Sequence, residues 1–364
     1  MPHQIRPNVL QMTPYVAGKP IEEVKRELGL DHVVKLASNE NPLGPSSLAV
    51  EAVREAASRM HLYPDASGYE LKAVLAAKAG LNLENVLVGN GSDELIHLLG
   101  LVLLQPGDQM VVGEPTFVRY AASADLMGVE LVKVPLDKDL RHDVAAMAKA
   151  FTDKTKLVYV SNPHNPTGTV VTKQEVSQLV EALPSGATLV LDEAYFEYTD
   201  GLADMPDAIG YVKDGKRVVS LRTFSKAYGL AGIRVGYGFA SADLVDAVNR
   251  AREPFDVNAL AQVAGIAALG DKAHLQRSVE INQAGIARIV EAASKLGFHA
   301  VPSFANFVCI AIDRPGTDVF QGLLKKGIII RPGEPLGLPN YIRVSVGTPD
   351  EIDKFIEAFN QVIA

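Results

Sequence analysis

The chain has 364 residues, of which 48% are hydrophobic and 21% are charged, and this length predicts two domains rather than one hydrophobic core. Its formal net charge of −8 argues against nucleic acid as a partner, because phosphate binding requires a basic surface. A single cysteine excludes an internal disulfide, the longest apolar run (residues 98–104) is too short to span a membrane, and no secretory pattern opens the chain, so we expect a cytoplasmic protein without a membrane partner.

The first part of the chain predicts an arm followed by helices. Residues 1–40 form the arm, which includes a short amphipathic helix at residues 21–28. A polar loop rich in turn residues follows at residues 36–44. Helical patterns then occupy residues 46–60, where a serine is placed to cap the helix, and residues 69–79.

The middle of the chain alternates strand and helix patterns, which predicts a mainly parallel sheet flanked by helices. The expected strands are residues 85–88, 109–112, 129–134, 156–160, 187–191 and 217–221. One more strand begins near Arg234, too soon after Leu221 for a crossover helix, so we expect it to run antiparallel to its neighbour. The large domain is therefore predicted to hold an α/β sheet with seven strands.

The last third changes character and predicts a smaller α+β domain. Its helical patterns and strands fall at residues 258–269, 271–296, 307–312, 327–331, 341–346 and 349–362. We therefore predict a large domain at residues 41–254 and a small domain at residues 255–364, with residues 1–40 packed against the small domain.

Distinctive polar residues follow five of the predicted strands, at the edge of an open parallel sheet where ligands bind. They are residues 89–94 (GNGSDE), 113–117 (GEPTF), 161–168 (SNPHNPTG), 192–195 (DEAY) and 223–226 (TFSK). Each cluster alone is typical of an ordinary turn, a helix cap or a surface charge. Their convergence on one edge indicates a single ligand site.

Lys226 is the most informative residue of these clusters. It follows a strand, next to Ser225 and eight positions before Arg234. A lysine whose neutral amine is favoured can form a Schiff base with a carbonyl, and the nearby hydroxyl and guanidinium groups suit a phosphate. Pyridoxal 5'-phosphate carries both a carbonyl and a phosphate, so it is the cofactor that this stretch predicts.

These motifs together resemble the fold-type I aminotransferases that depend on pyridoxal 5'-phosphate. The resemblance rests on Asn165-Pro166-Thr167-Gly168, Asp192-Glu193-Ala194-Tyr195, and Ser225-Lys226 with Arg234. Finer features are similar to the histidinol-phosphate aminotransferase subfamily: Met12-Thr13-Pro14-Tyr15, Asn39-Glu40-Asn41-Pro42, Tyr63-Pro64, Glu114-Pro115-Thr116-Phe117, Ile330-Arg331 and Ile342-Arg343. The family fold is a large domain with a mainly parallel seven-stranded sheet and a smaller domain built from the C-terminal third and the N-terminal arm.

The resemblance implies roles for the residues that match the family motifs. Lys226 would hold the cofactor and then move the substrate proton, which requires an amine whose pKa lies below its usual value. Asp192 would pair with the pyridine nitrogen and keep it protonated. Tyr195 and Asn165 would bind the ring hydroxyl oxygen, and Phe117 would stack on the ring face.

The cofactor phosphate is expected at the N-terminus of the helix that starts near Ser92. The residues expected around this phosphate are Gly91, Ser92, Asp93, Thr223, Ser225 and Arg234. In the family, a tyrosine that matches Tyr63 reaches the phosphate from a partner subunit. The resemblance therefore implies a homodimer with shared active sites.

The substrate-facing residues implied by the resemblance are Tyr15, Asn41, Arg331 and Arg343. Two arginines and a tyrosine fit a dianionic phosphate better than one carboxylate. We therefore expect transamination between L-histidinol phosphate and 2-oxoglutarate, which yields imidazole-acetol phosphate and L-glutamate.

Two alternatives within the fold stay open: an aminotransferase for phenylalanine or tyrosine, and a decarboxylase of a phosphorylated amino acid. A nucleotide-dependent dehydrogenase is disfavoured because it would leave Lys226, Asp192 and Asn165 without a role. A non-enzymatic regulator that binds the cofactor would need an additional DNA-binding module, for which the chain has no spare length.

Overall fold

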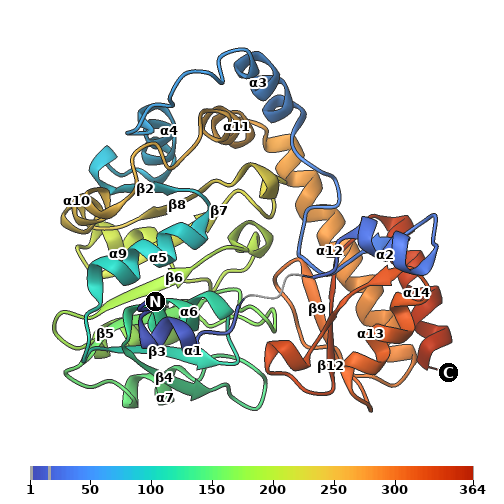
Figure 1. Ribbon diagram of the computed structural model, residues 1–364. Helices are drawn as coiled ribbons and strands as arrows, with labels where there is room; N and C mark the ends of the chain where they lie inside the picture. The colour runs from blue at the N-terminus through green and yellow to red at the C-terminus, as the bar shows by residue number, and fades with distance from the viewer. Residues whose placement is uncertain (1–2, 15–17, 364) are drawn as a thin grey trace.

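The computed structural model describes residues 3–14 and 18–363. It contains a large α/β unit and a smaller unit beside it, and the long helix α12 (Lys272–Lys295) runs along the smaller unit (Figure 1). Within the described residues, no helix is long and apolar enough to cross a bilayer.

The large unit is built on one sheet, which has seven strands in the part of the chain that the structure describes. Their order is β2 (Val86–Gly89), β8 (Gly236–Phe239), β7 (Val218–Thr223), β6 (Thr188–Asp192), β5 (Thr155–Ser161), β3 (Gln109–Glu114) and β4 (Glu130–Pro135). Strand β8 is antiparallel to both of its neighbours, whereas the other neighbouring pairs are parallel. The predicted mainly parallel sheet and its antiparallel strand are confirmed.

Helices cover both faces of this sheet (Figure 1). The helices of this unit are α3 (Ser47–Ala57), which packs on α11 rather than on the sheet, α4 (Tyr69–Ala79), α5 (Ser92–Leu103), α6 (Val118–Met127), α7 (Val144–Lys149), α8 (Lys173–Ala182), α9 (Ala208–Lys213), α10 (Ala242–Ala251) and α11 (Ala259–Gly270). The short 3-10 helices of the chain are η1 (Leu83–Asn85), η2 (Phe196–Thr199), η3 (Ala231–Ile233) and η4 (Glu334–Leu336).

Strand β5 shows why the sequence folds into a sheet with two covered faces. Its side chains alternate between two cores: Leu157 and Tyr159 pack with the residues of α5 and α6, whereas Val158 and Val160 pack with those of α7 and α8. All four are fully buried. A continuous apolar run of this kind is typical of a parallel strand buried on both faces.

The smaller unit contains a three-stranded antiparallel sheet, counted over the described residues, in the order β11 (Arg331–Pro332), β12 (Tyr341–Ser345) and β9 (Phe307–Ala311). A second pairing joins β1 (Val34–Lys35) in parallel to β10 (Ile328–Ile329). Helices α13 (Gly316–Leu324), α14 (Pro349–Ile363) and α2 (Ile21–Leu28) complete this unit.

The single strand predicted at residues 327–331 is wrong in one respect, because the chain divides there between two sheets. Strand β10 pairs with β1, and β11 pairs with the edge of β12. Pro332 has no N–H to donate, which suits the edge strand β11. The division places Arg331 on the sheet that also carries Arg343.

The N-terminal arm contacts both units. In α2, Val24 packs with Ala37 and with Leu324 and Ile329 of the smaller unit. The preceding helix α1 (Pro7–Gln11) instead lies against α6, where Arg6 donates to the carbonyl of Leu126 at 2.7 Å. The last carbonyls of a helix lack partners inside the helix, and the arm supplies one here. The predicted grouping of the whole arm with the small domain stays a prediction, and the contact of α1 with α6 shows that part of the arm also meets the large unit.

The boundary predicted at residues 254–255 stays a prediction. Helix α11 follows that boundary but packs against α3 and α4, and its Ala261, Ala264 and Ala268 belong to the core that contains Leu71 of α4. This packing favours a boundary closer to the start of α12.

Candidate active site

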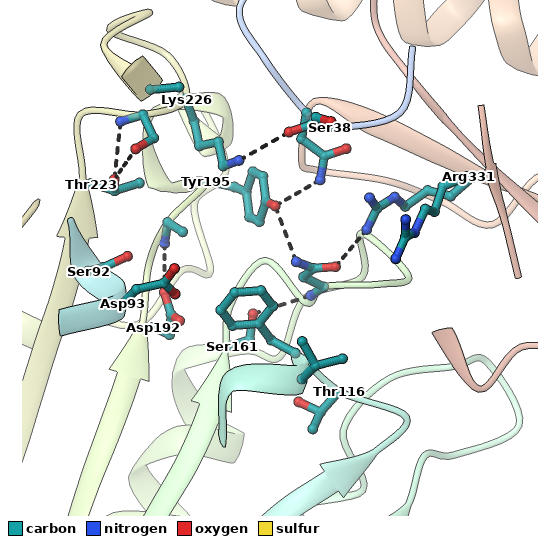
Figure 2. A pocket seen from close by; sticks show the side chains of 18 of the residues that line it. Ser38, Ser92, Asp93, Thr116, Ser161, Asp192, Tyr195, Thr223, Lys226 and Arg331 are labelled. Carbon is teal, nitrogen blue, oxygen red and sulfur yellow. Dashed lines mark hydrogen bonds between the residues drawn. The ribbon is translucent and has the colours of Figure 1, made fainter. Parts of the chain in front are cut away.

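A cavity of about 230 Å³ lies where the carboxyl ends of the central strands face the smaller sheet (Figure 2). The predicted site residues that line it are Ser92, Asp93, Phe117, Asn165, Asp192, Tyr195, Thr223, Ser225, Lys226, Arg234, Arg331 and Arg343. They come from at least seven separate stretches of sequence, and the topology of the sheet brings them together.

Lys226 lies in the loop after β7 and points into the cavity. The loop begins with a tight turn in which Thr223 Oγ1 accepts a hydrogen bond from Ser225 N at 3.1 Å. Lys226 Nζ donates to the carbonyl of Ser38 at 3.4 Å (Figure 2). Burial lowers the pKa of Lys226 to about 8, the guanidinium of Arg343 adds to the decrease, and Arg234 contributes less. Lys226 is therefore partly neutral near pH 7 and can act as a nucleophile or a base.

Asp192 ends strand β6 and is 4% exposed. Its Oδ2 accepts a hydrogen bond from Tyr120 Oη at 2.6 Å, and its Oδ1 accepts one from Ala194 N at 3.2 Å. Burial raises the pKa of Asp192 to about 6, while these two hydrogen bonds act in the opposite direction. A buried carboxylate at the wall of a cavity is suited to a ligand that presents a cationic N–H.

Tyr195 is held by two asparagine side chains (Figure 2). Its hydroxyl accepts hydrogen bonds from Asn39 Nδ2 at 2.9 Å and from Asn165 Nδ2 at 3.4 Å. Asn165 in turn accepts a bond from Arg343 Nη1 at 2.9 Å. The network fixes the Tyr195 hydroxyl between the Lys226 side of the cavity and the arginine side.

The N-terminus of α5 forms the next wall of the cavity. Helix α5 starts at Ser92, directly after Gly91, whose φ is 83°. Arg234 lies beside it, with Nη2 at 4.0 Å from the carboxylate of Asp93, and its backbone adopts a φ of 60°. Free N–H groups at a helix start and an adjacent guanidinium provide an anion site.

Two glycines allow this wall to form. A Cβ on Gly236 would contact the backbone of Ser92 and lie 2.6 Å from the carbonyl carbon of Gly91, and a Cβ on Gly91 would collide with the guanidinium of Arg234. Gly91 itself does not line the cavity. Its role is to let Arg234 approach the start of α5.

Two arginines face the cavity from the smaller sheet. Arg331 and Arg343 are register partners on β11 and β12, and Arg343 is 6% exposed. Arg343 also donates from Nη2 to the carbonyl of Ala37 at 3.2 Å and places Cζ 4.9 Å from the ring centre of Phe307. The pair creates a cationic end opposite Asp192 and Lys226, consistent with the predicted anion anchor.

Besides Gly91, two predicted site residues among those that the structure describes do not line the cavity. Asn41 is turned away, because its Nδ2 donates to the carbonyl of Ala227 at 2.8 Å and to Ser278 Oγ at 2.9 Å. Tyr63 is 82% exposed and stacks on Phe255, with ring centres 4.7 Å apart. Tyr15 lies outside the described residues.

The cavity is also lined by residues that were not among the predicted site residues, although some of them belong to the motifs named above. They are Gly18, Ala37, Ser38, Asn39, Thr116, Val118, Tyr120, Ser161, Ala194, Ala231 and Leu336. Asn39 belongs to the Asn-Glu-Asn-Pro motif that pointed to Asn41, and only the backbone path shows which of the two faces the cavity. No sequence signal connects Tyr120 with Asp192, because the contact depends on the packing of α6.

The residues present fit a cofactor that carries a carbonyl, a protonated ring nitrogen and a phosphate. Lys226 supplies an amine, Asp192 a buried carboxylate, Phe117 an aromatic face and the start of α5 an anion site. No group of three or more His, Cys, Asp or Glu side chains among the described residues is placed to hold a metal ion.

Comparisons with known proteins agree with this geometry. A profile of the family described as Aminotransferase class I and II matches residues 31–359. The histidinol-phosphate aminotransferase of Moorella thermoacetica is 48% identical over 360 residues, which cover 99% of this chain and 93% of that protein. Histidinol-phosphate aminotransferase 2 of Carboxydothermus hydrogenoformans is 44% identical over 359 residues and 99% of each chain.

Solved structures show the same fold. The crystal structure of histidinol-phosphate aminotransferase from Sinorhizobium meliloti, in complex with pyridoxal-5'-phosphate, has a TM-score of 0.91 at 30% identity and covers 99% of this chain and 97% of that chain. The aspartate aminotransferase of Thermus thermophilus with maleate has a TM-score of 0.85 at 23% identity, over 99% of this chain and 100% of that one, and shares the fold alone.

Proposed function

This chain belongs to the family of class I and II aminotransferases, and from that premise we propose that it transfers the amino group of L-histidinol phosphate to 2-oxoglutarate with pyridoxal 5'-phosphate as cofactor. The observation that carries the proposal is one cavity with an amine of lowered pKa, a buried carboxylate and a pair of arginines at its opposite end. The choice of substrate rests on the relatives named above, which are histidinol-phosphate aminotransferases. The reaction belongs to histidine biosynthesis.

The cofactor would be held by residues from the start of α5, from the end of β6 and from the loops that follow β3 and β7. Asp192 would accept a hydrogen bond from the ring nitrogen, Phe117 would cover one ring face, and Ser92, Ser225 and Arg234 would bind the phosphate. When bound, pyridoxal 5'-phosphate supplies a carbonyl that takes up the amino group and a ring that accepts the electron pair left when the substrate carbon loses its proton.

Lys226 is the residue proposed to hold and move that proton. Because its pKa is lowered from 10.5 to about 8, a much larger fraction of its amine is neutral near pH 7 than in an ordinary lysine. Its hydrogen bond to the Ser38 carbonyl is long at 3.4 Å, so little is lost when the amine turns toward a substrate. Tyr195 and Asn165 would orient the ring hydroxyl oxygen from the adjoining wall.

Arg331 and Arg343 are proposed to bind the anionic end of each substrate. A phosphate monoester carries nearly two negative charges near neutral pH, and two guanidinium groups match it better than one. The same pair would bind a carboxylate of 2-oxoglutarate when that substrate occupies the cavity. Arg343 is buried and hydrogen-bonded to Asn165 and to the carbonyl of Ala37. We therefore propose that Arg343 is the arginine with a fixed position that anchors the substrate anion.

We also propose that the protein is a homodimer in which Tyr63 serves the partner's site. Large apolar side chains near Tyr63 are exposed: Met60 by 68%, Leu62 by 58%, Tyr69 by 54% and Phe255 by 41%. A second copy would cover this surface. Tyr63 stacks on Phe255 away from its own cavity, which supports a role toward a second subunit.

A substrate panel tests the proposed activity. The purified protein, loaded with pyridoxal 5'-phosphate, is assayed with L-histidinol phosphate, L-phenylalanine and L-tyrosine, each with 2-oxoglutarate, and carbon dioxide release is followed in parallel. We expect the highest kcat/KM for L-histidinol phosphate and no release of carbon dioxide. A higher kcat/KM for an aromatic amino acid would instead identify an aromatic aminotransferase, and carbon dioxide release would identify a decarboxylase.

The variant Arg331→Ala sharpens the same assay. If Arg331 binds the second negative charge of the substrate phosphate, its removal lowers kcat/KM for L-histidinol phosphate by about ten- to a hundredfold. This is the range expected for the loss of a hydrogen bond to a charged group. The loss with L-phenylalanine would be smaller. Equal losses for both substrates would remove Arg331 from phosphate recognition.

A further inference from the structure

The Tyr120 hydroxyl contacts the carboxylate of Asp192 at the wall of the cavity. Tyr120 belongs to α6, is 0% exposed and donates from Oη to Asp192 Oδ2 at 2.6 Å. This distance is at the short end for a bond between a hydroxyl and a carboxylate, which is typical of a charge-assisted hydrogen bond.

Packing prevents the Tyr120 ring from moving away from Asp192. The ring stacks on Tyr159 with centres 4.3 Å apart and an angle of 12° between the planes. Phe117 contacts it edge to face at 5.7 Å. Tyr120 therefore connects the residue expected to cover the cofactor ring with the residue expected to bind its nitrogen.

We propose that Tyr120 is a positioning residue that aims the Asp192 carboxylate at the ring nitrogen of the bound cofactor and keeps that carboxylate ionised. This inference rests on the proposed function, because the ring nitrogen belongs to pyridoxal 5'-phosphate. Tyr120 acts through Asp192 and is assigned no contact with the substrate.

The charges around Asp192 show why a hydrogen-bond donor is needed to keep its carboxylate ionised. Asp93 on α5 and the adjacent Glu193 both oppose ionisation of Asp192, as does its burial, while Tyr159 on β5 is a neutral phenol nearby. The Tyr120 hydroxyl and the Ala194 N–H are the groups that favour the charged form. Burial and the Asp192 charge raise the pKa of Tyr120 well above its usual value, so the hydroxyl keeps its proton and continues to donate.

The test compares Tyr120→Phe with Tyr159→Phe. Both changes remove one buried phenolic oxygen from the same stacked pair. The Tyr159 hydroxyl, however, contacts the carbonyl of Ile96 at 3.4 Å and donates nothing to Asp192. The two variants therefore differ in the hydrogen bond to Asp192 and match in lost volume.

The first measurement uses the protein without cofactor and follows its unfolding free energy from pH 4.5 to 8. Asp192 has a folded pKa of about 6, above its usual 3.8, so it reduces stability progressively as the pH rises through this interval. Removing the Tyr120 hydroxyl raises this pKa further. Relative to the wild type, Tyr120→Phe should lose about tenfold more in the folding equilibrium at pH 8 than at pH 4.5, as expected for a shift of about one pKa unit.

The second measurement is the dissociation constant of pyridoxal 5'-phosphate across the same pH range, read from its absorbance. In Tyr120→Phe, the pH at which binding weakens on the acidic side should rise by about one unit. Tyr159→Phe should keep the wild-type profile. Identical pH profiles for the two variants in both measurements would overturn the proposal.

If Tyr120→Phe folds poorly, the same substitution is also tested in the Asp192→Asn variant. Asp192→Asn removes the titrating group, so adding Tyr120→Phe to it should cause a loss of stability that does not change with pH. A pH-dependent loss in that background would contradict a role through Asp192. Failure of the wild type to bind pyridoxal 5'-phosphate would contradict the proposed function, whereas the measurement without cofactor would still decide whether Tyr120 controls Asp192.

Discussion

Arg343 on β12 donates a hydrogen bond from Nη1 to Asn165 Oδ1 at 2.9 Å. The bond joins the smaller sheet to the loop after β5, and Asn165 passes the contact on to the Tyr195 hydroxyl. The residue proposed to bind the substrate anion is thus linked directly to those proposed to orient the cofactor ring.

Replacing Arg343 should therefore affect substrate binding more than cofactor binding. We predict that Arg343→Ala raises KM about ten- to a hundredfold for both the amino donor and the keto acceptor, because both lose a charge-assisted hydrogen bond. The content of pyridoxal 5'-phosphate should stay near the wild-type value. Steady-state kinetics and cofactor absorbance measure the two quantities.

The control for this variant is Arg314→Ala in the same unit. Arg314 is 40% exposed and pairs with the neighbouring Asp313 away from the cavity, so its removal should leave both KM values unchanged. Arg343→Lys separates charge from geometry, and we expect it to recover only part of the loss, because an ammonium cannot bind Asn165 and an anion in the fork arrangement of a guanidinium. Unchanged kinetics in Arg343→Ala would remove this residue from the site.

Most of the large sheet follows from local sequence pattern. The buried strands are short apolar runs, and the antiparallel direction of β8 follows from the short link after β7, which excludes a crossover helix. The division of residues 327–331 between β10 and β11 was missed, because a period-2 pattern shows which residues are extended but not which strand they pair with. Helices α1 and α13 were also missed, the first because its five residues carry no amphipathic pattern.

The site was predictable to the extent that its residues stand at strand ends. Lys226, Asp192 and Asn165 converge because parallel strands end at one edge. Asn41 was expected in the cavity in place of Asn39. Both asparagines belong to the motif Asn39-Glu40-Asn41-Pro42, and the motif alone does not reveal which of the two side chains faces the cavity. Tyr120 reaches Asp192 through tertiary packing, which no local pattern encodes.

Gly236 should be essential for the anion site at the start of α5. In Gly236→Ala, the added Cβ would meet the backbone of Ser92 and Gly91, so the strand and the helix must separate. We predict a loss of about 1–3 kcal/mol in the free energy of unfolding, as for an overpacked core, and weaker binding of pyridoxal 5'-phosphate. Chemical denaturation and cofactor titration measure both.

Gly232→Ala is the matched control in the same loop. Nothing lies within 4 Å of the position of its Cβ, so stability and cofactor binding should match the wild type. Equal effects of the two substitutions would show that close approach at Gly236 is unimportant.

Uptake of pyridoxal 5'-phosphate by the protein without cofactor should depend on pH through Lys226. Its pKa is lowered from 10.5 to about 8, so the neutral fraction of the amine rises up to about pH 8 and then levels off. We predict that the rate of covalent uptake follows this curve between pH 6.5 and 9.5. A rate that still rises about tenfold per pH unit above pH 9, as expected for an unshifted lysine, would refute the lowered pKa.

Sharing of active sites between subunits predicts complementation. If Tyr63 acts in the partner's site, Lys226→Ala and Tyr63→Ala chains are each impaired alone, but a mixed dimer contains one site with both residues intact. Refolding the two variants together at equal concentration should restore about a quarter of wild-type activity, because about half of the dimers are mixed and each has one complete site. No gain over the separate variants would place Tyr63 outside the partner's site.

The account depends most directly on the covalent attachment of the cofactor to Lys226. The protein loaded with pyridoxal 5'-phosphate is reduced with borohydride, digested and analysed by mass spectrometry, with a folded Lys226→Ala variant treated in parallel. We predict a pyridoxyl group on the wild-type peptide that contains Lys226, no such group in the variant and no turnover by the variant. A pyridoxyl group on a different lysine, or its absence from every peptide, would contradict the assignment.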